Sequence, residues 1–524
     1  MIKHFIISTF FITSTLFAQK KAPDNWQLLN PTSDKVYGAG VESAYVTLKG
    51  KKSKTVIVAV IDGGVDIEHE DLKGVIWTNP GEIPDNGIDD DKNGYIDDVH
   101  GWSFLGGKNG DVDYESTEIA RMYQHMSKKF KAQDTAHLST DDAKEFTEYK
   151  KIRSIFLKDQ EKEEMELRAV LMFSDFLEHA KKQNNGVLSK KSLKSYIPEN
   201  EIEKKIKKRL KLLFLLGIKP EDLDGQIAEG RKMFENSVKY NRMNVDSIRE
   251  YFVGDDVNNV NERYYGCNRV KGPDALHGTH VSGIIAAVRN NKIGINGIAD
   301  NVKIMPIRAV PNGDERDKDI ANAIRYAVDN GATIINMSFG KYYSPDKKLV
   351  DEAVEYALTK DVLLVHAAGN DSKNSDTALS YPNFELQSGK NVPNWIEVGA
   401  NGYKKGKNII GSFSNYGKTK VDLFAPGVDI YSTISDNKYV SESGTSMASP
   451  VAAGVAALIR SYFPELKAEE VKKVLMKTVV PYKKKIIKPG SRRGKVKIKE
   501  LCISGGFINA NNAVLELMGL APKK

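Results

Sequence analysis

Cysteine is scarce in this sequence. The 524 residues include only Cys267 and Cys502, too few for a disulfide framework or a cysteine-rich zinc site. Long apolar runs are also missing: the run over 5–18 is shorter than the roughly 20 residues that a membrane-spanning helix needs, and no later run reaches that length. Charge of one sign is not dominant either, because 77 basic and 69 acidic residues leave a net charge of +8. We therefore expect no transmembrane anchor and no dedicated binding of nucleic acid.

The N-terminus has the features of an export signal. Lys3 precedes the apolar run, which ends at Ala18 before polar residues follow. A short basic start, an apolar stretch and a small residue at its end are typical of a signal peptide, which we assign to 1–18, with a buried first helix as the alternative. We expect an exported protein, periplasmic or extracellular. In such a compartment Cys267 and Cys502 could pair, and the sequence does not decide whether they do.

Two separated segments alternate between strand and helix patterns. Residues 55–61 form a continuous apolar, β-branched run, typical of a parallel strand buried on both faces. From 54 to 111 the pattern is strand, loop, helix and loop. Later strands are predicted at 302–307, 332–336, 362–366 and 395–399, with helices at 279–288, 319–329, 347–359 and 446–462. This alternation predicts an α/β fold: a doubly wound, mostly parallel sheet with helices on both faces, built from 54–111 and 263–480.

The intervening segment, 112–262, has a different texture. Of the 110 residues from 141 to 250, 24 are basic and 21 acidic, well above the 28% charged residues of the whole chain. Apolar residues recur there at helical spacing, as at Tyr149, Ile152 and Phe156. We predict a mainly α-helical insertion. The remaining parts are an N-terminal extension over 19–53 and a closing segment over 481–524, whose lysines and Pro489-Gly490 turn predict a basic β-hairpin.

Four short motifs carry the candidate chemistry. Asp62, in VIDGGVD (60–66), ends a buried strand, where α/β sheets place their active sites, although many strands end in such a turn. His277 opens HGTHVSG (277–283), in which an imidazole can act as a general base or, with His280, as a metal ligand. Ser446 lies in GTSMASP (444–450) at a helix start, where a serine is most often a cap. Asn370 ends AAGN (367–370) after another strand.

Together these motifs resemble the subtilisin-like serine proteases, including the chain order Asp, His, Ser. The resemblance covers 45–111, 263–480 and 506–510. It implies that Ser446 is the nucleophile, that His277 takes and returns its proton, and that Asp62 orients the imidazole. It also implies that Asn370 and the backbone N–H of Ser446 form the oxyanion hole. His280 is then a structural residue.

The resemblance extends to substrate binding. Ser338, Phe339 and Gly340 match the edge along which an extended peptide adds as a strand. Asp371 follows Asn370 and is expected to bias the primary pocket toward basic residues. One departure is Gly63, which stands where the family usually has a serine or threonine beside the catalytic aspartate.

Two loops are candidates for structural calcium, and no cofactor is expected for catalysis. Residues 89–97 (DDDKNGYID) place oxygen ligands at Asp89, Asp91, Asn93 and Asp97, but position twelve is His100 instead of glutamate, so that Asp98 would have to substitute. The alternative is an acidic, solvated turn. The second loop, 290–295, resembles the family's calcium loop. That resemblance implies Asn291, the carbonyls of Ile293 and Ile295, and the distant Asp71 as ligands, with Arg289 as a departure.

The sequence therefore favours an exported, monomeric endopeptidase that acts on proteins or peptides. The alternative is a catalytically impaired scaffold of the same fold that binds peptides or envelope partners, and transpeptidation on the same acyl-enzyme also stays open. About 30 residues separate the signal peptide from the first motif region, so we expect no large propeptide domain. We expect the helical insertion to lie near the active-site rim and to restrict access of substrates.

Overall fold

The computed structural model describes residues 22–131, 138–215 and 220–520. The predicted signal peptide lies outside the described residues. Two compact units are distinguished: a helical unit, Ile119–Val245, and an α/β unit that runs from Ala22 to Glu118 and resumes at Asp246.

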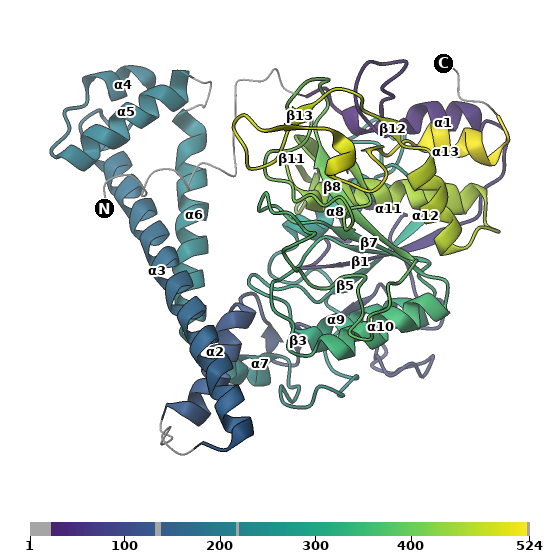
Figure 1. Cartoon of the computed structure of the whole chain (residues 1–524), viewed down its shortest axis with the longest axis horizontal. Coiled ribbons are helices and arrows are strands. Elements are labelled where there is room, and N and C mark those ends of the chain that lie inside the picture. The colour runs from purple at the N-terminus through teal and green to yellow at the C-terminus, as the bar shows by residue number, and fades with distance from the viewer. Residues whose placement is uncertain (1–21, 132–137, 216–219, 521–524) are drawn as a thin grey trace. The chain divides into compact units, whose positions relative to one another are not determined.

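A nine-stranded sheet forms the centre of the α/β unit (Figure 1). Adjacent strands are parallel except for the outermost pair, β12 and β15. In spatial order the strands are β12 (Val480–Pro481), β15 (Gly506–Phe507), β9 (Leu423–Pro426), β8 (Trp395–Asn401), β7 (Leu363–Ala367), β6 (Ile334–Met337), β1 (Val56–Asp62), β5 (Val302–Arg308) and β2 (Trp102–Ser103). The predicted mostly parallel sheet is thereby confirmed.

Helices cover both faces of this sheet (Figure 1). On one face lie α8 (Leu276–Ala286), α11 (Thr445–Tyr462), α12 (Ala468–Lys477), α13 (Ala510–Leu517) and α1 (Val41–Thr47), and on the other lie α9 (Asp317–Asp329) and α10 (Lys347–Thr359). The alternation of side chains along a strand explains the two cores. Val58 and Val60 of β1 pack with α8 and α11, whereas Ala59 and Ile61 pack with α9 and α10.

The predicted helix within 54–111 is wrong. After β1, this segment is loop apart from the 3-10 turn η2 (Glu70–Leu72) and the short strands β2, β3 (Gly106–Gly107) and β4 (Gly110–Asp111). The reason is that its Asn and Asp side chains bond to backbone N–H groups, as Asn79 does to Gly81 and Asn93 to Tyr95. Such bonds replace helical ones. The other predicted elements exist with ends shifted by up to three residues, α8 beginning at Leu276.

The helical unit is built around one long helix. It contains α2 (Glu118–Phe130, whose first residue belongs to the α/β unit), α3 (Thr140–Lys182), α4 (Lys190–Ser195), α5 (Glu201–Leu215) and α6 (Pro220–Tyr240). Ser139 caps α3 by accepting the N–H of Asp142 at 3.1 Å. Phe173 and Phe176 of α3 pack with Leu210 of α5 in a separate core. The last helix of this region, α7 (Asp246–Phe252), belongs to the α/β unit.

The closing segment contains the predicted hairpin, in which β13 (Ile486–Ile487) pairs with β14 (Lys495–Val496), beside the 3-10 turn η3 (Ile498–Glu500). A second small hairpin pairs β10 (Ile430–Ile434) with β11 (Lys438–Glu442), and a 3-10 turn, η1 (Trp26–Leu28), lies near the start.

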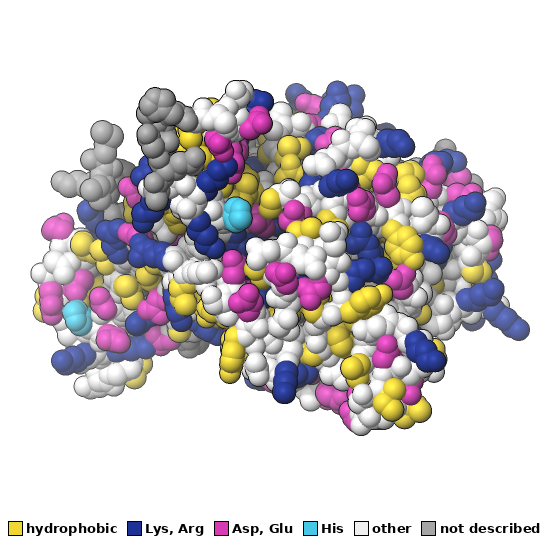
Figure 2. Space-filling model, turned by 90° about the horizontal axis from the view of Figure 1, so that it is seen from below, with side chains coloured by type: hydrophobic (Ala, Val, Ile, Leu, Met, Phe, Trp, Pro, Cys, Tyr) yellow, Lys and Arg dark blue, Asp and Glu magenta, His cyan; other side chains and the backbone are white. Residues whose placement is uncertain are grey.

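Cys267 and Cys502 are both free thiols. Among the described helices, none is long and apolar enough to cross a membrane. On the face in Figure 2, basic and acidic side chains are interspersed.

Candidate active site

Asp62 is the last residue of β1, at the carboxyl edge of the parallel sheet. The backbone N–H of Gly63 donates to its Oδ1 at 2.8 Å, so a peptide group beside the carboxylate supplies a hydrogen bond even though the usual hydroxyl is missing. Gly64 has a φ of +146°, and a side chain there would collide with the carbonyl of Lys271. Glycine is therefore required for the turn that leaves Asp62 at the sheet edge.

His277 lies in the first turn of α8 and faces Asp62. Its Nδ1 is 2.8 Å from Oδ1 and 2.9 Å from Oδ2 of that carboxylate. The Asp62 side chain is 4% exposed and that of His277 is 43% exposed, so the carboxylate is sequestered while the ring is reachable. Burial by itself lowers the pKa of His277, but the charge and hydrogen bond of Asp62, with Glu442 and Asp274, raise this pKa above its ordinary value.

Ser446 is the second residue of α11, whose N-terminus favours negative charge. Its Oγ donates to the carbonyl of Ser338 at 3.1 Å, and the Ser338 hydroxyl donates back to the Ser446 carbonyl at 3.0 Å. No hydrogen bond joins Ser446 to His277 within the described residues. Catalytic hydrogen bonds are commonly long without substrate, and a contact between Ser446 and His277 would require the hydroxyl to turn away from Ser338.

The side-chain amide of Asn370 is held by one neighbour. Its Oδ1 accepts the N–H of Thr445 at 2.9 Å and the Thr445 hydroxyl at 3.0 Å, which leaves Nδ2 as a donor. An ideal Cβ on Gly444 would lie 3.5 Å from Asn370 Nδ2 and 3.6 Å from the Ser446 N. Two N–H donors thus lie next to the same small space, which glycine leaves open.

His280 has a different environment from His277. It is buried, and its Nε2 lies 3.1 Å from the carbonyl of Ile430 and 3.2 Å from that of Val440. Burial lowers its pKa to about 4. The ring is therefore neutral and donates to the β10–β11 hairpin, a structural arrangement that does not suit a metal pair with His277.

The predicted substrate-binding edge directly follows β6. Ser338 is buried, Phe339 half-buried and Gly340 exposed. Lys341 next to them is 4% exposed and exchanges two backbone hydrogen bonds with Tyr381. Asp371, predicted to bias specificity, accepts a hydrogen bond from the Tyr342 hydroxyl.

The first calcium candidate is arranged differently from the predicted pattern. Asp89 accepts the N–H groups of Asn93 and Gly94, and Asp97 those of Asn86 and Gly87. The carboxylates that do converge within 4.8 Å are those of Glu82, Asp91 and Asp98. Asn93 lies beside this group, because its amide donates to Asp91 and Asp98. Sequence reasoning missed Glu82, which lies outside the repeating pattern.

The second candidate brings its predicted residues together. Asn291 Nδ2 donates to Oδ1 of the buried Asp71 at 2.7 Å, and the Ile295 N–H donates to Oδ2 at 3.0 Å. Burial raises the pKa of Asp71. Nearby, Asn25 accepts the N–H of Asn296. Two residues from Asn25, Gln27 is 1% exposed and its amide oxygen and nitrogen have no hydrogen-bond partner. An unsatisfied buried oxygen fits a calcium ligand.

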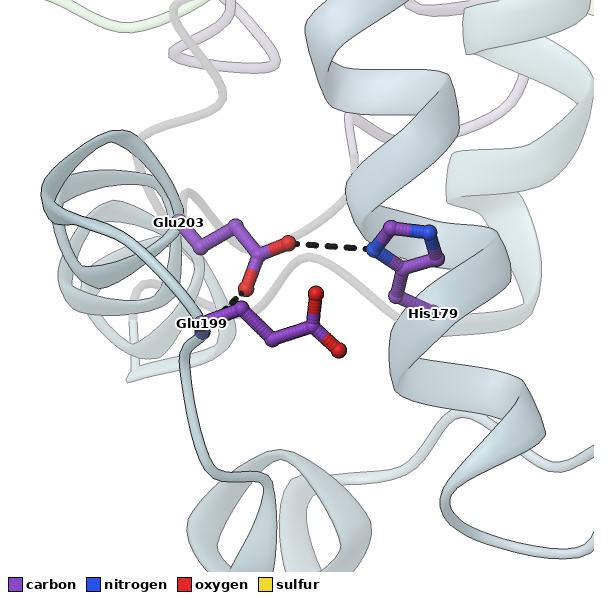
Figure 3. Close-up of side chains that lie close together, drawn as sticks. All are labelled: His179, Glu199 and Glu203. Atoms are coloured by element: carbon purple, nitrogen blue, oxygen red, sulfur yellow. Dashed lines mark hydrogen bonds and ion pairs between the residues drawn. The ribbon is translucent and has the colours of Figure 1, made fainter.

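One further group of possible ligands lies in the helical unit, where Figure 3 shows His179, Glu199 and Glu203. The Glu203 carboxylate already accepts hydrogen bonds from the Tyr196 hydroxyl at 2.6 Å and the Glu199 N–H at 2.7 Å. His179 Nδ1 lies 3.1 Å from the same carboxylate. These bonds join α3 to α5, which accounts for the cluster without an ion.

Comparisons with known proteins identify the family of the chain. The family model described as "Subtilase family" matches residues 53–497. The chain is 48% identical over 187 residues to the thermophilic serine proteinase of Bacillus sp. (strain AK1), across 35% of this chain and 42% of that protein. It is 37% identical over 249 residues to the cell wall-associated protease of Bacillus subtilis (strain 168), across 47% and 26%. It is 41% identical over 186 residues to thermitase of Thermoactinomyces vulgaris, across 35% and 61%. The chain spans less than half the length of the first two of these relatives.

Proposed function

Because the chain belongs to the subtilase family, we propose that it is an exported serine endopeptidase that hydrolyses peptide bonds through an acyl-enzyme. The observation that supports this best is the contact of His277 Nδ1 with the buried Asp62 carboxylate at 2.8 Å. That contact fixes the ring so that Nε2 is the nitrogen available for proton transfer. Export rests on the apolar run that follows Lys3.

The proposed reaction follows from these groups. His277 Nε2 removes the proton of Ser446 Oγ as the oxygen attacks the substrate carbonyl, and the new negative charge is stabilised by Asn370 Nδ2 and the Ser446 N–H. The imidazolium, stabilised by Asp62, then protonates the leaving amine. Water attacks the acyl-enzyme in the same way and releases the second product. Thr445 acts as a positioning residue, because its two bonds orient the Asn370 amide.

Labelling by a fluorophosphonate tests this proposal. We expect the folded wild-type chain to be labelled rapidly and the Ser446→Ala variant to be unlabelled, because only an activated hydroxyl attacks the phosphorus atom. The labelling rate should rise with pH as His277 loses its proton, with a midpoint above the ordinary 6.5 because its pKa is raised. Ser441→Ala, at an exposed position of β11, is the matched control. Equal labelling of wild type and Ser446→Ala would favour a peptide-binding scaffold.

We further propose that the loop over 290–295 holds a structural calcium ion, with Asp71 and Asn291 as side-chain ligands and the buried Gln27 as a candidate for a third. Catalysis needs no metal in this scheme. The ion would supply a positive charge to balance the buried Asp71 carboxylate.

Thermal unfolding with and without calcium checks this site. We expect EDTA to lower the unfolding temperature of the wild type and to have little effect on Asp71→Asn, since a ligand at 100 times its dissociation constant adds about 2.7 kcal/mol. Calcium affinity should fall on acidification at a higher pH than for an ordinary aspartate, because the pKa of Asp71 is raised. Asp141→Asn, on the exposed start of α3, is the control. An equal EDTA response in Asp71→Asn and wild type would place the ion elsewhere.

A further inference from the structure

A histidine and a glutamate lie side by side in the middle of the sheet, behind the proposed substrate-binding edge. His366 is on β7 and Glu397 is on β8, and the two residues are directly paired in the parallel register. Their side chains are 1% and 8% exposed. The proposed mechanism uses neither residue, and a buried ionisable pair needs a physical account.

Both nitrogens of the His366 ring face acceptors. Nδ1 lies 3.1 and 3.0 Å from the two carboxylate oxygens of Glu397, and Nε2 lies 2.8 Å from the carbonyl of Phe339. A neutral imidazole has only one N–H, so it can donate to one of these partners and not to both. The doubly protonated imidazolium satisfies both, and the adjacent carboxylate balances its charge.

The glutamate is itself fixed. The indole N–H of Trp395 donates to Glu397 Oε2 at 2.8 Å. The backbone N–H of Glu397 donates to Asp422 at 2.8 Å, and Asp422 is paired with Lys472 at 3.0 Å. The carboxylate therefore presents its oxygens to His366 in one orientation.

The contact of His366 with Phe339 connects the buried pair to the proposed substrate-binding edge, and this edge in turn contacts Ser446. Phe339 is the middle residue of the Ser338–Gly340 segment, and an ideal Cβ on Gly340 would lie 3.6 Å from His366 Nε2. The edge backbone thus lies directly against the ring. Ser338, the residue before Phe339, is joined to Ser446 by two hydrogen bonds.

We infer that the His366–Glu397 pair is a positioning device for substrate binding: the imidazolium holds the Phe339 carbonyl and thereby sets the edge against which an extended peptide pairs. This inference rests on the proposed function. It assigns the pair to the binding of extended substrates, and leaves the attack by Ser446 to the Asp62–His277 pair.

The surrounding charges keep the proton on His366. Burial opposes the charged ring, but Glu397 through its charge and hydrogen bond, the Phe339 carbonyl, and the charge of Glu315 raise its pKa. Burial raises the pKa of Glu315 itself to about 7, so this carboxylate is largely ionised at pH 8. Further out, Lys341 Nζ contacts the Glu315 carbonyl at 2.7 Å. Because its pKa is raised, His366 keeps its second proton to a higher pH than an ordinary histidine and loses it as the pH rises through that value.

Glu397→Gln tests the inference, because glutamine keeps the shape and removes the charge. We expect KM for a peptide long enough to pair with the edge to rise about tenfold at pH 8, the size expected for one charge-assisted hydrogen bond, with kcat changed less than threefold. In the variant His366 should lose its second proton at a lower pH than in the wild type, because burial is no longer balanced by the charge of Glu397. Labelling by a small fluorophosphonate, which does not use the edge, should stay unchanged. Glu465→Gln, at an exposed position, is the control.

Direct measurement of the protonation state of His366 tests this inference separately from the proposed function. In chain labelled with nitrogen-15 at histidine, we expect the His366 signal, assigned by its loss in His366→Gln, to show two protonated nitrogens at pH 8. A neutral His366 at pH 8 overturns the inference, even if Glu397→Gln fails to fold. An unchanged KM in Glu397→Gln also overturns it. Failure of the wild type to react with the fluorophosphonate counts instead against the proposed function.

Discussion

Replacing His277 by alanine is expected to lower kcat for peptide hydrolysis by about 10⁶-fold, and adding Ser446→Ala is expected to cost little more. The reason is that the hydroxyl and the imidazole act as one unit: without the base, Ser446 stays protonated, bonded to the Ser338 carbonyl. A residual rate of about 10³–10⁴-fold over water should survive in the double variant, because Asn370 and the backbone N–H of residue 446 would still stabilise the oxyanion.

The measurement is kcat for one peptide substrate in the wild type, the two single variants and the double variant. His125→Ala, an exposed histidine of α2, controls for loss of an imidazole elsewhere and should leave kcat unchanged. Losses that multiply in the double variant would contradict a shared role and would place His277 outside the step in which Ser446 reacts.

The residues of the proposed triad were predictable because each is marked by local sequence. Asp62 ends an apolar strand, and Ser446 opens an apolar helix after Gly444, so chain direction alone places both at the carboxyl edge of a parallel sheet. His277 lies in the first turn of its helix, where its motif predicts it. Each of these patterns spans only a few residues, and the order of the strands in the sheet brings the three residues together.

The His366–Glu397 pair was not predictable in the same way. His366 lies in an apolar run that predicts only a buried strand, and Glu397 lies in another 31 residues later. Their contact depends on which strands become neighbours and on the pairing register. The local sequence of a strand indicates neither its neighbours in the sheet nor its pairing register. Gln27, the candidate third ligand of the proposed calcium site, was not predictable for a related reason, since its unsatisfied amide is recognised only when its burial is known.

Spacing alone does not show how the loop over 89–97 uses its carboxylates, and the calcium site there stays a prediction. The pattern over 89–97 predicts calcium ligands at alternate positions, but Asp89 and Asp97 bond to backbone N–H groups of the same loop region. A short acidic side chain satisfies a turn as readily as it binds a cation. The expected position of the helical insertion at the active-site rim stays a prediction.

Asn370→Ala is expected to lower kcat by about 10²–10³-fold while KM changes little. In the ground state the substrate carbonyl carries little charge, so the amide contributes mainly once the tetrahedral oxyanion forms. The donor is aimed by Thr445, whose N–H and hydroxyl both bond to Asn370 Oδ1. Thr445→Val removes one of these bonds and should cost less, roughly tenfold, because the backbone N–H still fixes the amide.

Separate measurement of kcat and KM distinguishes this role from simple substrate binding. A raised KM with an unchanged kcat for Asn370→Ala would mean that the amide binds substrate and transition state equally. Asn391→Ala, at an exposed position, is the matched control and should leave both constants unchanged. Gly444→Val adds an independent check: its side chain would enter the space beside Asn370 Nδ2 and the Ser446 N. Because Gly444 has an extended backbone with φ of 175°, that substitution acts by filling the space and not by straining the chain, so a loss of kcat in both variants would locate the oxyanion there.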